Sequence, residues 1–202
     1  MPPPPPRPIH ISGHAREVRD FYATPAWVTE ALLKHVTFRD KVWEPCCGTG
    51  AIADVLLRRG YPVVATDIAE HGYGQGGVDL LACTAMPPGC GALVTNPPYG
   101  DGGDQRDRAR SPTALLDMIR HMLALTAAAE AQLALLVRLQ WIAGKRAAAL
   151  IQSGPCTRII TLTRRIRWFD QDETNNAQHH HAWIVFDHRR ARRGPPGFIL
   201  TD

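Results

Sequence analysis

Residues 41–60 read KVWEPCCGTGAIADVLLRRG, and this stretch predicts a strand, a glycine turn and a helix in succession. The short strand Lys41–Trp43 leads directly into the turn, which ends at Gly50. Ala51–Arg59 has the apolar spacing of a helix, and Gly60 is a typical stop signal. Glycines at the end of a first strand let the backbone pass close to a ligand that a side chain would block. The stretch therefore predicts the first unit of an α/β fold, with a possible ligand site at its turn.

The rest of the sequence alternates strands with helices. Predicted strands are Val63–Asp67, Val78–Leu81, Ala92–Thr95, Leu133–Leu139, Arg158–Leu162 and Ala182–Phe186. Predicted helices are one that begins at Thr24-Pro25, with Thr24 as its N-cap, and those at Pro112–Ala129 and Lys145–Gln152. This alternation predicts a doubly wound, mostly parallel α/β sheet with helices on both faces. In such sheets, ligands bind beyond the carboxyl ends of the strands.

Composition sets the outer limits. The 202 residues suit one domain, and 45% apolar with 21% charged residues is an ordinary globular balance. We expect a Pro-rich segment at 1–20, one domain at 21–188 and a basic tail at 189–202. No apolar run is long enough for a membrane span and no signal pattern is found, so we expect a cytoplasmic protein. The net charge of +4 favours an anionic partner.

The turn at 44–50 combines an acidic residue with two glycines. Glu44 lies at the tip of the first predicted strand, and its charge suits a sulfonium or an amino group rather than a pyrophosphate. That distinguishes the turn from a dinucleotide fingerprint, in which a helix N-terminus binds an anion. For Gly48 and Gly50 taken alone, a plain tight turn is the alternative.

Two further acidic residues follow the next strands. Asp67 ends the second predicted strand, where a carboxylate can accept hydrogen bonds from both ribose hydroxyls of a nucleoside. Its neighbour Ile68 can pack on an adenine ring. Asp79 and Leu80 can supply an acceptor for the exocyclic amine and an apolar wall beside the ring. The alternatives are a turn cap for Asp67 and a charged rim position for Asp79.

The motif Asn96-Pro97-Pro98-Tyr99 comes directly after an apolar strand. Prolines cannot donate to a sheet ladder, so the strand must stop here and the chain is held stiff. The side-chain oxygen of Asn96 and the carbonyl oxygen of Pro97 can accept two hydrogen bonds from one amino group. Such pairing draws the nitrogen out of conjugation and turns its lone pair toward an incoming methyl group. Tyr99 can stack on the ring that bears the amine, at ~1–3 kcal/mol per base.

Together these motifs resemble those of the adenine-N6 amino-methyltransferases, which carry Asn-Pro-Pro-Tyr after the fourth strand and Glu-Pro-x-x-Gly-x-Gly after the first. The segment FYATP at 21–25 resembles their N-terminal cofactor motif Phe-Tyr-Thr-Pro with Ala23 inserted, and the motif order is that of the gamma arrangement. The resemblance covers residues 21–186. It implies a Rossmann-like fold of the class I methyltransferase type, with seven strands of which the last is antiparallel, and S-adenosylmethionine as cofactor. It assigns the cofactor to Tyr22, Thr24, Pro25, Glu44, Gly48, Gly50, Asp67 and Asp79, and the target amine to Asn96, Pro97, Pro98 and Tyr99.

The resemblance implies adenine N6 in a nucleic acid as the acceptor, with DNA favoured over RNA. Methyltransferases that modify a glutamine amide in release factors share Asn-Pro-Pro-Tyr, but they have a helical N-terminal domain in place of the segment at 21–25. A nucleotide-binding module that has lost activity is the further alternative. The length leaves no room for a separate target-recognition domain, so we expect weak sequence selectivity or a partner that supplies it.

Two basic segments are candidates for contact with nucleic acid. The candidate residues are Arg106, Arg108 and Arg110 in the loop 101–110, and Arg164, Arg165, Arg167 and Trp168 after the predicted strand at 158–162. Arginines beside aromatic side chains suit phosphate contact and base stacking. A solvated loop and arginines that merely face solvent are the respective alternatives.

No metal site is expected. His179, His180 and His181 are adjacent, and side chains alternate in a strand, so the three cannot share one ion if they enter one. The five cysteines show no metal-ligand spacing and are an odd number, which argues against a disulfide framework. We interpret the pair Cys46-Cys47 as small fillers of the turn.

Overall fold

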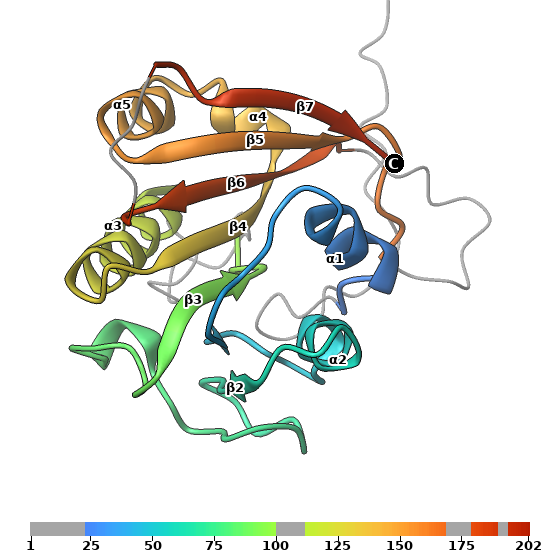
Figure 1. The fold of residues 1–202 in the computed structure, drawn as a ribbon, viewed down its shortest axis with the longest axis vertical. Helices are drawn as coiled ribbons and strands as arrows, with labels where there is room; N and C mark the ends of the chain where they lie inside the picture. The colour runs from blue at the N-terminus through green and yellow to red at the C-terminus, as the bar shows by residue number, and fades with distance from the viewer. Residues whose placement is uncertain (1–22, 100–111, 169–178, 190–193) are drawn as a thin grey trace, which may run out of the picture.

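The computed structural model describes residues 23–99, 112–168, 179–189 and 194–202. Within these ranges seven strands form one sheet in the order β2-β1-β3-β4-β6-β5-β7 (Figure 1). The strands are β1 (Lys41–Glu44), β2 (Val63–Ala65), β3 (Cys90–Thr95), β4 (Gln132–Arg138), β5 (Cys156–Leu162), β6 (His181–Asp187) and β7 (Gly197–Thr201). The helices are α1 (Ala26–Leu33), α2 (Ala51–Arg58), the short 3-10 helix η2 (Leu80–Ala82), α3 (Pro112–Ala128), α4 (Leu139–Ile142) and α5 (Lys145–Ser153).

Neighbouring strands are parallel, except that β6 runs antiparallel to both β4 and β5. The prediction of a mostly parallel seven-stranded sheet is therefore confirmed. The reversed strand, however, is the sixth along the chain and not the last. The reversal places the start of β6, at His181, opposite the end of β4, at Arg138.

Two segments differ from the sequence prediction. The strand predicted at Val78–Leu81 is wrong, because the Asp79 carboxylate accepts the backbone N–H of Leu81 at 2.9 Å and closes the turn of η2. The basic tail predicted at 189–202 is wrong in part, since Gly197–Thr201 forms β7 and pairs in parallel with β5. Its apolar and β-branched run favours a strand, a signal that the neighbouring arginines obscured.

Helices cover both faces of the sheet, which confirms the doubly wound prediction. In Figure 1, α1 and α2 lie on one face while α3 and α5 lie on the other. Leu32 of α1 and Leu56 of α2 belong to one buried core, whereas Ile119 of α3 belongs to the second. The indole N–H of Trp183 in β6 donates to the carbonyl oxygen of Val28 at 2.9 Å and ties α1 to the sheet. No helix in the described ranges is both long and apolar enough to cross a membrane.

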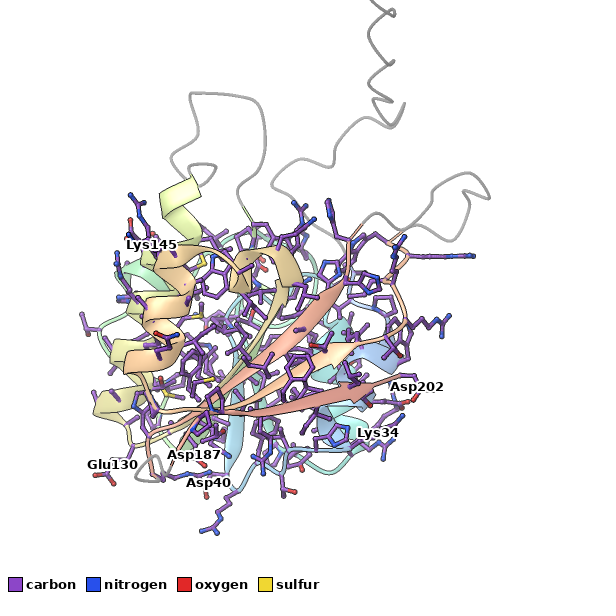
Figure 2. All side chains as sticks on the ribbon, turned by 90° about the horizontal axis from the view of Figure 1, so that it is seen from above. Lys34, Asp40, Glu130, Lys145, Asp187 and Asp202 are labelled. Atoms are coloured by element: carbon purple, nitrogen blue, oxygen red, sulfur yellow. The ribbon has the colours of Figure 1, made fainter. Side chains whose placement is uncertain are left out.

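The two ends of the sheet are distinct. Asp40 precedes β1, Glu130 precedes β4 and Asp187 ends the antiparallel β6, and Figure 2 shows these three residues toward one end of the molecule. That end carries the amino ends of the parallel strands. The carboxyl ends lie opposite, toward Lys145 at the start of α5 (Figure 2). The polar motifs of the sequence fall at this carboxyl end.

Candidate active site

The strands β2, β1 and β3 are neighbours in the sheet. Strand β1 ends at Glu44, while Asp67 and Asn96 come shortly after the ends of β2 and β3. The turn after β1 is joined to Asp67, because the Gly48 N–H donates to Asp67 Oδ2 at 2.8 Å. The other carboxylate oxygen, Oδ1, accepts the backbone N–H of Ala69 at 2.9 Å. These bonds fix the turn and the Asp67 carboxylate to each other. The carboxylate lies at the carboxyl edge and caps a turn at the same time.

Glu44 has an open hydrogen-bonding position in the interior. Its side chain is 1% exposed, and Oε2 has no hydrogen-bond partner among the described residues. Burial raises the pKa of Glu44 well above its usual range, and the charges of Asp67 and Asp54 raise it further. The backbone N–H of Ala53, in the first turn of α2, donates to the carboxyl group and opposes that shift. A buried acid under these conditions favours a cationic ligand that would let it ionise.

Gly50 is needed for a reason that the sequence did not reveal. Its φ is +87°, and a Cβ at this position would collide with the ring of Tyr73. The Tyr73 hydroxyl donates to Asp54 Oδ1 at 2.8 Å, which holds the ring over the turn. Tyr73 comes from the loop after β2 and has no motif that marks it. Part of the glycine pattern is therefore explained by packing within the chain.

The two apolar residues beside Asp67 and Asp79 differ in how far they are exposed. Ile68 is 59% exposed, so its side chain is free to pack on a ligand ring. Asp79 caps η2, as described above, whereas Leu80 is 4% exposed and packs in the core with α3. The exposed apolar side chain of this turn is its neighbour Leu81, at 52%. The ring-wall role of Leu80 stays a prediction.

The Asn96 side chain is held from both sides. Its Nδ2 donates to the hydroxyl oxygen of Thr24 at 3.1 Å, and its Oδ1 accepts the Tyr99 hydroxyl at 2.6 Å. Thr24 was predicted as the N-cap of α1. That is wrong, because Pro25 is the N-cap and the helix has no side-chain capping bond. The Thr24 hydroxyl instead contacts Asn96, which brings together two motifs that are 72 residues apart.

Tyr99 is buried in this arrangement. Its ring is 9% exposed, the Arg138 guanidinium carbon lies 5.2 Å from the ring centroid, and the ring of His181 lies 6.1 Å away. The hydroxyl also lies 3.1 Å from the carbonyl oxygen of Leu136 in β4. Pro97 has no N–H that could donate to β4. The carbonyl oxygen of Leu136 is therefore available to the Tyr99 hydroxyl. The stacking face predicted for Tyr99 is not open in this arrangement.

The sequence predicts no role for His181, but the residue lies beside Tyr99 of the Asn96–Tyr99 motif. It is 2% exposed, and neither ring nitrogen has a well-formed hydrogen bond within the described ranges, although the backbone of His179 approaches the ring closely enough to favour its protonated form. Burial and the positive charge of Arg138 lower the pKa of His181 to about 4, and the backbone of His179 offsets part of the shift. The Trp168 ring packs edge-on against it, with centroids 5.4 Å apart. The sequence could have indicated this position only if the antiparallel direction of β6 had been predicted.

The basic segment after β5 lies at the same edge and is partly engaged. Arg164 stacks on the ring of Trp27, 4.9 Å from its centroid, and the Nε of Arg165 donates to Nε2 of His180 at 3.1 Å. Arg164, Arg165 and Arg167 are all exposed, whereas Trp168 is half-buried. Tyr22, Arg106, Arg108 and Arg110 lie outside the described residues.

The described residues contain no group of three His, Cys, Asp or Glu side chains that could hold a metal ion. Burial raises the pKa of both Cys46 and Cys47 to about 12, which keeps their thiols protonated near pH 7. These findings agree with the interpretation of the pair as fillers of the turn.

Comparison with known proteins gives similarity in structure only. No family model and no curated protein matches the sequence at a significant level. Among solved structures, a Listeria monocytogenes protein described as a class I S-adenosylmethionine-dependent methyltransferase has a TM-score of 0.59 and 16% identity over 93% of this chain and 67% of its own. A Vibrio vulnificus protein described as a modification subunit of a type I restriction enzyme has a TM-score of 0.54 and 12% identity over 89% of this chain and 47% of its own. A Pyrococcus horikoshii protein described as an RNA methyltransferase has a TM-score of 0.54 and 15% identity over 84% of this chain and 87% of its own.

The chain thus spans about half the length of the Vibrio subunit and two thirds of the Listeria protein. At such identities the likeness concerns the fold. The sheet, the helices on both of its faces and these neighbours together show a Rossmann-like α/β fold of the class I methyltransferase type.

Proposed function

We propose that this protein transfers a methyl group from S-adenosylmethionine to an exocyclic amino group, adenine N6 of a nucleic acid, with DNA favoured over RNA. One observation carries the proposal. The amide of Asn96 is fixed at the end of β3 by Thr24, one strand away from the buried, open carboxyl group of Glu44. An acceptor for an amine thus lies beside an acceptor for a cation, at the edge of the sheet where ligands bind.

The residues at the ends of β1 and β2 fit the cofactor. Glu44 presents to the positively charged methionine end a carboxyl oxygen that has no partner in the described part of the chain. Asp67 uses one lone pair of each oxygen for backbone N–H groups, and Nε2 of His71 lies 3.8 Å from Oδ1, so Oδ2 offers the clearer acceptor for a ribose hydroxyl. The exposed Ile68 packs on the adenine ring, and Asp79 lies at the rim. The methyltransferase neighbours in fold support this assignment.

The chemistry requires little from the protein beyond positioning. Bound S-adenosylmethionine supplies an electrophilic methyl group. Asn96 Oδ1 and the Pro97 carbonyl accept the two N–H bonds of the target amine, so that its lone pair points at the methyl group. Thr24 holds the other end of the Asn96 amide and fixes its orientation. In a direct transfer the amine nitrogen would bond to the methyl carbon as the methyl–sulfur bond breaks, S-adenosylhomocysteine would leave, and the product nitrogen would release one proton to solvent, so no nucleophilic side chain is needed.

A polyanionic substrate is supported by charge. Arg164, Arg165 and Arg167 are exposed at the same edge of the sheet as Asn96, and the net charge is +4. Extraction of a base from a duplex costs a few kcal/mol, which favours single strands or mismatched sites as substrates. Similarity to a protein described as a restriction-enzyme modification subunit agrees with a DNA substrate and with a partner that supplies sequence specificity.

The test uses the full chain and methyl-labelled S-adenosylmethionine against equal masses of single-stranded DNA, duplex DNA, RNA and a release-factor-like protein. We expect label in the single-stranded DNA, at adenine after digestion to nucleosides, and none with Asn96→Ala. Label in the protein arm alone would assign glutamine-amide methylation instead. Label in none of the arms, from a chain that binds the cofactor, would leave the inactive nucleotide-binding module.

A further inference from the structure

The space next to Asn96 is filled by the side chain of Tyr99. Its hydroxyl donates to Asn96 Oδ1 at 2.6 Å, and its ring extends from there to His181, 6.1 Å between centroids. Arg138 lies over the ring. The phenol hydroxyl thus makes the bond that a target amine would make. A substrate ring that donates to Asn96 Oδ1 must displace Tyr99 and take the space beside His181.

His181 lacks a partner in this space. Both ring nitrogens are buried and without a well-formed hydrogen bond in the described part of the chain, and only the backbone of His179 partly compensates the ring there. Tyr99 and Trp168 approach with their rings, and Arg138 faces His181 across the β4–β6 pair. A phenylalanine at this position would keep an aromatic ring there without leaving two polar atoms buried and unpaired. Buried polar groups in native proteins are paired as a rule, so an exception points to a missing ligand.

The protonation state of the His181 imidazole restricts the chemical class of that ligand. Burial and the positive charge of Arg138 disfavour its protonation and lower its pKa to about 4, so the ring stays neutral near pH 7. A neutral imidazole has one N–H donor and one acceptor nitrogen. It does not suit a phosphate, which pairs best with a cation. It suits the edge of an uncharged heteroaromatic ring.

We infer that His181 is a specificity-determining residue of the acceptor pocket, where it hydrogen-bonds a ring nitrogen of the base whose amino group binds Asn96. The inference rests on the proposed function. His181 takes no part in bond making and contacts the substrate at a second point. Two-point recognition, at the amine by Asn96 and at the ring by His181, distinguishes adenine from other amines.

The test measures kcat/KM for short single-stranded oligonucleotides that carry adenine, 1-deazaadenine or 7-deazaadenine, with His181→Phe and a matched control. The control is His188→Phe, because the Nε2 of His188 is also buried and has no partner among the residues the structure describes, but His188 follows β6 at the opposite end of the sheet. We expect the wild type and the control to lose ~10- to ~100-fold on the analogue that lacks the contacted nitrogen. His181→Phe should lose as much on adenine, and it should no longer distinguish adenine from that analogue.

Two separate readouts keep the outcomes distinct. The affinity for S-adenosylmethionine and the melting temperature of His181→Phe should stay at or above the wild-type values, since the change removes unpaired polar atoms. Unchanged selectivity in His181→Phe, with an active wild type, overturns the inference and leaves the proposed function. A wild type that binds the cofactor but methylates no adenine overturns both.

Discussion

The substitution Glu44→Gln tests the cofactor site at its most unusual group. Glutamine has nearly the same shape, and its carbonyl oxygen can still accept the Ala53 N–H that the carboxyl group accepts now. The open Oε2 becomes an NH2 group, which donates and cannot bind a cation. We expect weaker binding of S-adenosylmethionine in a protein that is at least as stable, because a buried acid close to Asp67 and Asp54 has been neutralised.

The size of the effect follows from the kind of bond that is lost. A hydrogen bond to a charged group contributes about 1.5–3 kcal/mol, which corresponds to ~10- to ~150-fold in Kd. The wild type should also show a pH dependence that the variant lacks. Burial raises the pKa of free Glu44, and a bound cation lowers it, so that binding releases a proton. Affinity therefore rises with pH up to the pKa of the free protein and is level above it.

Calorimetry in two buffers of different ionisation enthalpy measures both the affinity and the released proton. Glu30→Gln is the matched control, since Glu30 is exposed and forms a surface ion pair with Arg59. S-adenosylhomocysteine, which lacks the sulfonium charge, separates the two possible contacts. An equal loss for both ligands places Glu44 at the amino group, and a loss for S-adenosylmethionine alone places it at the sulfonium. Equal affinity and no proton release in wild type and variant would refute the reasoning.

Three further predictions address the acceptor, the substrate and the buried histidine. Asn96→Ala should lower methyl transfer ~100-fold or more with little change in cofactor affinity by calorimetry; a joint loss would make Asn96 structural. Replacing Arg164 and Arg165 with Ala should make the log–log salt dependence of oligonucleotide binding shallower by about one to two units, in a fluorescence titration with DNA of any sequence; an unchanged slope would remove both residues from the interface. The free energy of unfolding should fall as pH drops from about 6.5 to about 4, because His181 takes up a proton in the unfolded chain at a higher pH than in the folded protein. His181→Phe should abolish about 3 kcal/mol of that loss in urea unfolding at several pH values, and an identical pH profile would contradict it.

Much of the fold could be predicted because its strands are short, apolar and separated by clear stop signals. The predicted strand Leu133–Leu139 is observed at Gln132–Arg138, and the predicted helix Lys145–Gln152 at Lys145–Ser153. The wrong predictions concern segments whose local sequence is compatible with two kinds of structure. Val78–Leu81 reads as a strand, but a single carboxylate at Asp79 closes a turn there. The segment that forms β7 was assigned to its charged neighbours rather than to its apolar residues.

The candidate site divides in the same way. The proximity of the glycine turn to Asp67 could be predicted, because parallel neighbours end at one edge of a sheet. The positions of Tyr73 and His181 could not. Tyr73 reaches the turn through a loop without a motif, and His181 reaches the pocket only because β6 runs backward. The spacing of apolar residues predicts which segments form helices and strands. It does not predict the direction of a strand such as β6 that lies between two others in the sheet.

The link between Thr24 and Asn96 changes the meaning of the N-terminal motif. The resemblance assigns this segment to the cofactor, yet the described bond goes to the acceptor residue. Since Thr24 occupies the amide nitrogen, the amide oxygen is directed to the pocket that Tyr99 now fills. An asparagine that could rotate freely would present its NH2 group to the pocket as often as its oxygen. The NH2 group is a donor and cannot pair with the N–H groups of the target amine. The segment before α1 therefore contributes to the acceptor site by fixing one rotamer, whichever cofactor contacts its neighbours make.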